Sequence, residues 1–191
     1  MSPIEAAAAL LVLINVALVA RRSLWNYPVG LAAVTLYGII FFRTRLYSDA
    51  LLQIFFFIVQ LYGWANWRAN RQQMGDITVS ELGWPARAGW AAGIVAATGG
   101  WGWTMHRFTD AAYPWWDAGV AMMSIAAQIL MSRRVIENWW LWIAVDLAAI
   151  GLYAAKALWL TAVVYALLLA ISAWGLVDWR RMARLQQQVS A

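Results

Sequence analysis

Seven apolar runs, most of them ended by arginine or another polar residue, fill almost the whole of this 191-residue sequence. A helix needs about 20 mostly apolar residues to cross a bilayer. Only 12% of the residues are charged, against roughly a quarter in soluble domains. The sequence therefore predicts an all-α integral membrane protein with seven transmembrane helices in contact with a lipid bilayer. The expected helices cover approximately residues 4–20, 27–42, 46–67, 88–105, 113–132, 138–155 and 157–179.

Several functional classes are disfavoured by what the chain lacks. It has no cysteine and a single histidine, His106, so neither a thiolate site nor a histidine cluster can hold a metal. No glycine-rich nucleotide loop and no hydrolase motif occurs, so we expect no cofactor and no enzymatic activity. The isoelectric point near 10 comes from arginines spread between the apolar runs, which argues against a nucleic-acid partner.

The distribution of basic residues predicts how the helices are oriented. Seven spans place the two termini on opposite sides of the membrane. Of the 14 basic residues, only Arg43, Arg45, Arg107 and Lys156 fall on the side of the N-terminus. Because basic residues concentrate in cytoplasmic loops, we expect the N-terminus outside the cell and residues 181–191 as a cytoplasmic tail.

An internal repeat becomes visible when the sequence is aligned with itself at an offset of 112 positions. The alignment needs no gap, and it predicts two three-helix repeats, 1–68 and 113–180, joined by a linker helix at 88–107. A single linker helix leaves both repeats in the same orientation, as in the SWEET transporters, which bind substrate near the midplane between their halves. The matched positions are Arg21–Arg22 with Arg133–Arg134, Asn26 with Asn138, Leu46 with Leu158, Gly63 with Gly175, Trp67 with Trp179, and Arg68 with Arg180.

The candidate functional site centres on Asp146, a carboxylate within the sixth apolar run. Such a residue costs about 2.5–3.5 kcal/mol if it faces lipid, so its presence calls for a function. Trp139, Trp142 and Asp146 follow the spacing i, i+3, i+7, which places them on one face of a helix. Indole rings accept flat or cationic rings, and a carboxylate pairs with positive charge. The alternative is a membrane-interface aromatic belt with a structural aspartate.

Four further polar side chains are candidates for contact with a ligand: Gln53, Gln60, Gln128 and Tyr37. The amides could bind ribose hydroxyls or a carboxamide, and Gln53 and Gln60 share one helix face. The alternative for each is hydrogen bonding between helices, which contributes about 0.6 kcal/mol on average.

The pattern Trp139-x-x-Trp142-x-x-x-Asp146 resembles the W-x-x-W-x-x-x-N/D signature of the PnuC vitamin transporters. The similarity extends to WNYPVG at 25–30, LYSDALLQ at 46–53 and YGWANWR at 62–68, and covers nearly the whole chain. The resemblance implies a SWEET-like fold in the bacterial inner membrane, a homotrimer with one pathway per subunit, and substrate binding by the Trp–Trp–Asp face. It also implies vitamin uptake by facilitated diffusion, with phosphorylation in the cytoplasm preventing return.

The residue at position 146 bears on which vitamin is carried. Nicotinamide riboside transporters of this family often have asparagine there, whereas this chain has aspartate. A buried carboxylate suits a cation, and nicotinamide riboside and thiamine are both cationic heteroaromatics, whereas riboflavin is neutral and larger. We therefore predict nicotinamide riboside as the substrate, with thiamine, and less so riboflavin, as alternatives.

Two other functions are compatible with the same residues. In a proton-coupled carrier, Asp146 would be a protonation site rather than a counter-ion for the substrate. A non-transporting scaffold or receptor would tolerate replacement of Asp146 by leucine and would bind no vitamin.

Overall fold

The computed structural model describes residues 3–43, 47–109, 113–155 and 159–189, and these residues form seven α-helices. The all-α class and the number of helices are as predicted, and α6 has the predicted bounds. Arg45, Lys156 and the Leu46–Leu158 repeat pair lie outside the described residues. The helices are α1 (Pro3–Ala20), α2 (Asn26–Arg43), α3 (Tyr47–Met74), α4 (Trp84–Phe108), α5 (Pro114–Ser132), α6 (Asn138–Ala155) and α7 (Trp159–Val189).

Three helices are longer than their apolar runs: α4 (Trp84–Phe108) extends the expected 88–105 at both ends, and α3 and α7 extend at their C-termini. α3 continues to Met74 and α7 to Val189, although the apolar sequence ends near Trp67 and Trp179. The added turns consist mostly of arginine, glutamine, alanine, methionine and leucine, which are good helix formers outside a membrane as well. The connection between α3 and α4 is therefore limited to residues 75–83, and the expected tail is helical up to Val189.

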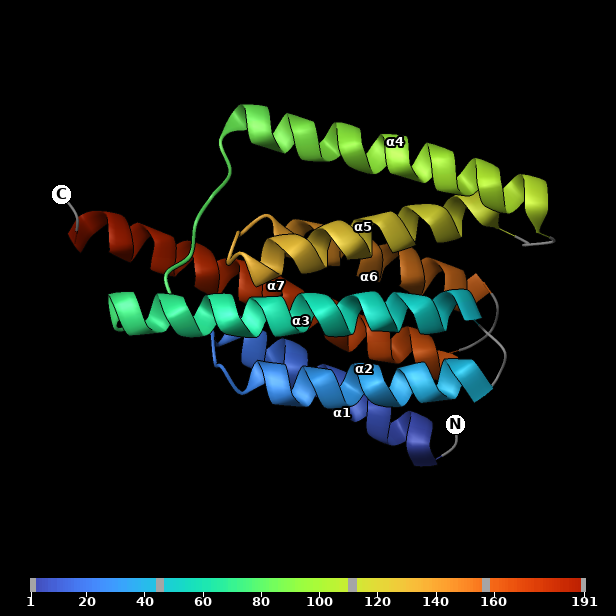
Figure 1. Ribbon diagram of the computed structural model, residues 1–191, viewed down its shortest axis with the longest axis horizontal. Helices are drawn as coiled ribbons and strands as arrows, with labels where there is room; N and C mark the ends of the chain where they lie inside the picture. Colours follow the sequence, from blue (N-terminus) through green and yellow to red (C-terminus); the bar gives the residue numbers. More distant parts are fainter. Residues whose placement is uncertain (1–2, 44–46, 110–112, 156–158, 190–191) are drawn as a thin grey trace.

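Six of the described helices form a closed ring, and the remaining helix, α4, lies outside it. Around the ring the order of neighbours is α1, α2, α3, α5, α6, α7 and back to α1, while α4, among the described residues, packs only on α5. Figure 1 shows α4 at the edge of the bundle, beyond α5. The first three and the last three helices thus meet at two seams, α1 with α7 and α3 with α5.

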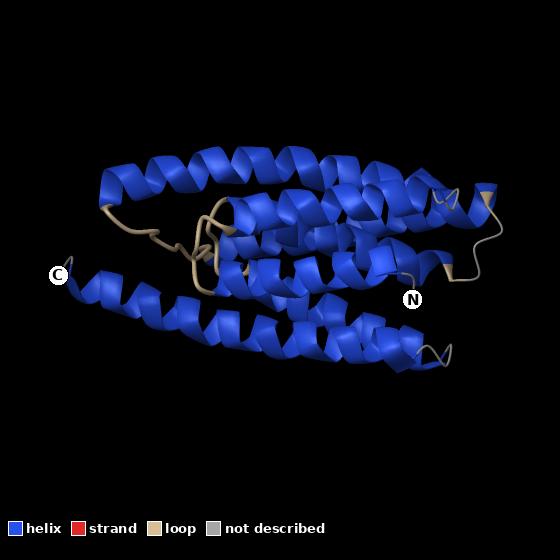
Figure 2. Cartoon of the chain, turned by 90° about the horizontal axis from the view of Figure 1, so that it is seen from below, coloured by secondary structure: helices blue, strands red, loops and turns tan. Residues whose placement is uncertain are grey.

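Apolar composition alone identifies only some of these helices as membrane spans. By length and composition, Pro3–Ala20, Ala50–Met74 and Thr161–Gln188 could each cross a membrane, and Asn138–Ala154 is a shorter apolar helix. For the other described helices, the expectation of a span rests on their place in the same bundle, where they run alongside these (Figure 2).

Two tryptophans, 112 positions apart, join the two seams through matching hydrogen bonds. Trp67 of α3 donates its indole N–H to the carbonyl of Met131 in α5 at 3.2 Å. Trp179 of α7 donates to the carbonyls of Val19 and Ala20 in α1 at 3.3 and 3.2 Å. The acceptors are carbonyls in the last turns of α1 and α5, where no intrahelical i+4 donor remains; those of Val19 and Met131 also accept the backbone N–H groups of Arg22 and Arg134. Each indole therefore closes one seam and caps the neighbouring helix.

A second aromatic residue stands against each of these tryptophans. The ring of Tyr27 lies edge-on to Trp67, and the ring of Trp139 lies edge-on to Trp179, each with centroids 5.5 Å apart. Trp67 and Trp179 are themselves in contact, and all four side chains are fully buried. We call this end of the bundle the arginine-rich end, because it carries Arg21, Arg22, Arg133 and Arg134 in turns and Arg180 and Arg181 within α7.

The loop of residues 75–83 crosses the arginine-rich end. Ile77 is buried in the aromatic core. Ser80 exchanges backbone hydrogen bonds with Arg134 and Ile136 in the turn between α5 and α6, at 3.0 and 2.9 Å. Glu137 binds the Leu82 amide at 3.2 Å. These contacts close the bundle at this end.

Substitution of Gly175 tests the close packing of this core. A Cβ at Gly175 would lie 2.5 Å from the ring of Trp139, which is fully enclosed. We expect Gly175→Ala to lower the free energy of unfolding by about 1–3 kcal/mol, as overpacking does in other cores. Thermal unfolding of the purified protein in detergent measures this. The control is Gly151→Ala in α6, where a Cβ meets nothing within 4 Å; equal melting temperatures for the two variants would contradict the packing described.

Candidate functional site

The Trp139–Trp142–Asp146 face runs from the aromatic core toward the middle of α6. The helix begins at Asn138, whose side-chain amide donates to the Val135 carbonyl at 2.7 Å. Trp139 is fully buried, Trp142 is half-buried against the same core, and Asp146 is 3% exposed. With a rise of 1.5 Å per residue, Asp146 lies about 10 Å along the axis from Trp139. The three residues are on one face, as their spacing predicted.

Asp146 is held by one neighbour on the adjacent helix. The hydroxyl of Ser172, in α7, donates to Oδ2 of Asp146 at 3.0 Å, and both side chains are buried. Within the described part of the chain, Asp146 forms no ion pair and its Oδ1 has no hydrogen-bond donor. A buried carboxylate with a single hydrogen bond retains capacity to bind a cation or a donor group.

Gln60, in α3, is the residue 112 positions before Ser172. It is buried, and its amide oxygen fills the space beside Gly30 of α2: a Cβ on Gly30 would lie 2.1 Å from that oxygen and 2.7 Å from the amide nitrogen of Asn15. Asn15 in turn donates to the backbone carbonyl of Asn26. The missing side chain at position 30 thus leaves room for two amides.

At this site, positions 112 apart carry different residues. Trp142 is matched by Gly30, Asp146 by Val34, and Ser172 by Gln60. At the arginine-rich end the matched aromatic residues instead make nearly the same contacts. The two halves therefore share the packing that closes the ring but carry different chemistry near its middle.

The other predicted site residues are less closely associated. Gln128 is buried in α5. Tyr37 stacks on Phe41 with ring centroids 5.6 Å apart, and it lies within electrostatic range of Tyr153, from α6. Gln53 is half-buried and lines a 410 Å³ groove formed by α2 and α3, to which the Trp–Trp–Asp face does not contribute.

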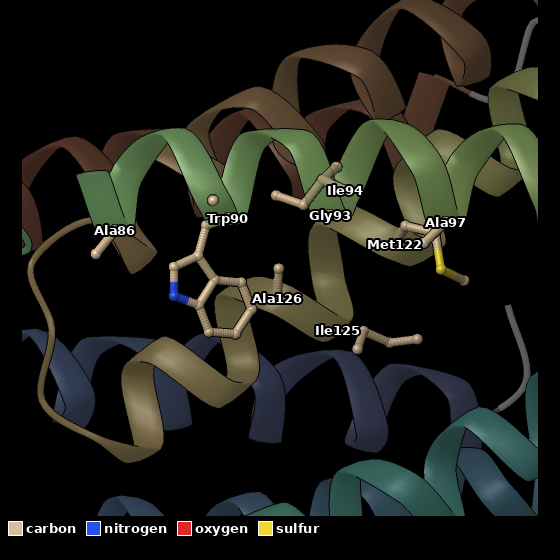
Figure 3. A pocket seen from close by; sticks show the side chains of 9 residues that line it. Ala86, Trp90, Gly93, Ile94, Ala97, Met122, Ile125 and Ala126 are labelled. Carbon is tan, nitrogen blue, oxygen red and sulfur yellow. The ribbon is translucent and has the colours of Figure 1, made fainter. Parts of the chain in front are cut away.

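A second groove lies between α4 and α5 and is unsuited to a polar solute. It measures 390 Å³, and Figure 3 shows the indole of Trp90 reaching from α4 over Ala126 of α5. The remaining lining residues are glycine, alanine, isoleucine and methionine. Such a surface offers no group that could recognise a cation or a row of hydroxyls.

Sequence reasoning did not identify Ser172 as a member of the site. A serine in an apolar helix usually bonds its own backbone, as Ser124 does to the Val120 carbonyl at 2.8 Å. The offset of 112 positions from Gln60 was the one signal that could have drawn attention to it. Tyr165 was also not assigned to the site; it stacks on Tyr153 with centroids 5.4 Å apart and lies within electrostatic range of Asp146.

A helical bundle with an ionisable residue buried between its membrane-crossing helices is the architecture of a membrane transporter. Residues 2–181 match the model of the family described as nicotinamide mononucleotide transporter, and the chain belongs to this family, which includes PnuC. The family and the apolar helices place it in the bacterial inner membrane. Its relatives are transporters rather than enzymes.

Two curated relatives and one solved structure illustrate the family. The chain is 31% identical to the nicotinamide riboside transporter PnuC of Escherichia coli, over 96% of this chain and 87% of that protein. It is 30% identical to the riboflavin/roseoflavin transporter RibM of Streptomyces davaonensis, over 87% and 79%. The crystal structure of the vitamin B3 transporter PnuC superposes with a TM-score of 0.79 at 26% identity, covering 95% of this chain and 82% of that one. The resemblance to PnuC proteins predicted from the sequence is confirmed.

The site predicts an unusual response of stability to the loss of Asp146. An unpaired buried carboxylate opposes folding, so we expect Asp146→Leu to leave the free energy of unfolding unchanged or to raise it by about 0.5–2 kcal/mol. Thermal unfolding in detergent checks this. A clear fall in melting temperature would mean that Asp146 has a structural role.

Proposed function

We propose that this protein takes up nicotinamide riboside across the bacterial inner membrane. The observation that carries the proposal is Asp146, a buried carboxylate with one hydrogen bond and no ion-pair partner among the described residues. A carboxylate in this state binds a cation more favourably than it would in water, because little solvent screens the attraction. The pyridinium ring of nicotinamide riboside carries such a charge.

The two tryptophans of the same face support an aromatic ligand. Trp142 is half-buried and lies one helical turn from Asp146, so its ring could stack on a cationic ring beside the carboxylate. The indole N–H of Trp139 is buried without an acceptor in the described part of the chain. An unpaired buried donor costs about 1–3 kcal/mol; because Trp139 is fully enclosed, a ligand oxygen could accept from this N–H only if neighbouring side chains move. The amides of Gln60, Gln128 and Gln53 and the hydroxyl of Tyr37 are proposed as further contacts.

The charge of the site also bears on the alternative substrates. A mononucleotide carries a phosphate, which a neighbouring carboxylate disfavours, so a nucleoside fits better than the compound in the family's description. Riboflavin is the alternative favoured by the relative RibM, but its ring system is neutral. Thiamine is cationic and remains the second candidate.

The proposed mode of transport is based on the family resemblance. We propose facilitated diffusion, with phosphorylation in the cytoplasm trapping the solute.

The matched seams and aromatic contacts support a 3+1+3 parallel repeat of the SWEET-like kind, with α4 as the linker. The basic residues at the arginine-rich end support placing that end in the cytoplasm. We further propose a homotrimer with one pathway per subunit.

A binding titration tests the substrate. Nicotinamide riboside, thiamine and riboflavin are titrated calorimetrically into the wild type and into Asp146→Ala. We expect micromolar affinity for nicotinamide riboside and a loss of about 10- to 100-fold in the variant, the usual contribution of an interaction with a charged group. Unchanged affinity in Asp146→Ala would move the site elsewhere. If none of the three compounds binds and Asp146→Leu retains its cellular role, a scaffold or receptor is the better description.

The dependence of uptake on a proton gradient separates the two modes of transport. Proteoliposomes are given a pH gradient of either sign and labelled nicotinamide riboside. With the membrane potential held at zero, facilitated diffusion predicts that the internal concentration of this cation rises only to the external one, whichever the sign of the pH gradient. Accumulation that follows the proton gradient and disappears in Asp146→Asn would instead establish a proton-coupled carrier.

A further inference from the structure

Ser172 differs from other hydroxyl residues within the helices. Ser124 and Thr35 donate to the carbonyl four residues earlier in their own helices, at 2.8 and 2.7 Å. The Ser172 hydroxyl instead reaches across to another helix and donates to Asp146. Backbone carbonyls of its own helix are within reach of such a hydroxyl, but the Ser172 hydroxyl binds the carboxylate instead.

The contact occurs in one half of the chain only. The positions 112 earlier hold Gln60 and Val34, and Gln60 is directed to the space beside Gly30. The serine and the aspartate have therefore no counterpart in the packing that the two halves share. A contact required only to hold α6 against α7 would have a counterpart between α2 and α3.

The hydrogen bond also determines how the carboxylate is presented. Because Ser172 occupies Oδ2, Oδ1 is the oxygen left for a ligand, and rotation of the carboxylate is restricted. A fixed charge binds a cation more tightly than a mobile one, since less conformational freedom is lost on binding.

We propose that Ser172 is a positioning residue that orients Asp146 toward the positive charge of the substrate, and so contributes to selectivity for cationic over neutral ligands. The proposal rests on the proposed function, because it presumes that Asp146 contacts the ligand.

The test compares two ligands that differ in charge. Nicotinamide riboside is a cation, whereas its reduced dihydro form is neutral and has nearly the same shape. We expect Ser172→Ala to weaken binding of the cation by about 10-fold and binding of the neutral form by less than twofold. Ser172→Thr keeps the hydroxyl and should restore selectivity. Ser124→Ala is the matched control, because it removes a buried hydroxyl that bonds only its own helix.

A double-mutant cycle shows whether Ser172 acts through Asp146. In the Asp146→Asn background, Ser172→Ala should no longer change the affinity for the cation. Melting temperatures verify that every variant is folded. Equal weakening for both ligands, or an unchanged effect in the Asp146→Asn background, would overturn the positioning role while leaving the proposed function intact. Absence of binding to the wild type would overturn both.

Discussion

The fold depends on hydrogen bonds from two indole N–H groups that cross between its halves. Trp67 and Trp179 each donate to a carbonyl at the end of a helix from the other half, so the seams between α3 and α5 and between α7 and α1 are closed in the same way. The acceptors lie in the last turns of α1 and α5, and those of Val19 and Met131 also accept backbone N–H groups of the following turns. Inside a lipid bilayer, burial of hydrophobic surface provides little driving force for helices to associate. Hydrogen bonds of this kind and close packing therefore hold the bundle together.

This common closure allows the rest of each half to diverge. Where the first half has Gly30, Val34 and Gln60, the second has Trp142, Asp146 and Ser172. The first half thus offers amides in a small space, and the second offers an aromatic surface and a carboxylate. The proposed substrate, with a cationic ring at one end and hydroxyl groups at the other, would be complementary to that asymmetry.

The sequence predicted those features that depend on local pattern. The number of helices and the bounds of α6 followed from apolar runs, and the common face of Trp139, Trp142 and Asp146 followed from helical spacing. The predicted C-terminal ends of α3 and α7 were wrong, because hydropathy falls at the membrane surface whereas helix propensity does not. Ser172 was missed because its partner lies 26 residues away on another helix, and only packing brings such residues together.

The most direct test of the account is a structure of the protein with nicotinamide riboside bound. The account predicts the pyridinium ring beside Trp142, with its charge facing Asp146 and the Ser172 hydrogen bond retained. A ligand located instead in the groove between α2 and α3, or between α4 and α5, with Asp146 unchanged and distant, would contradict it.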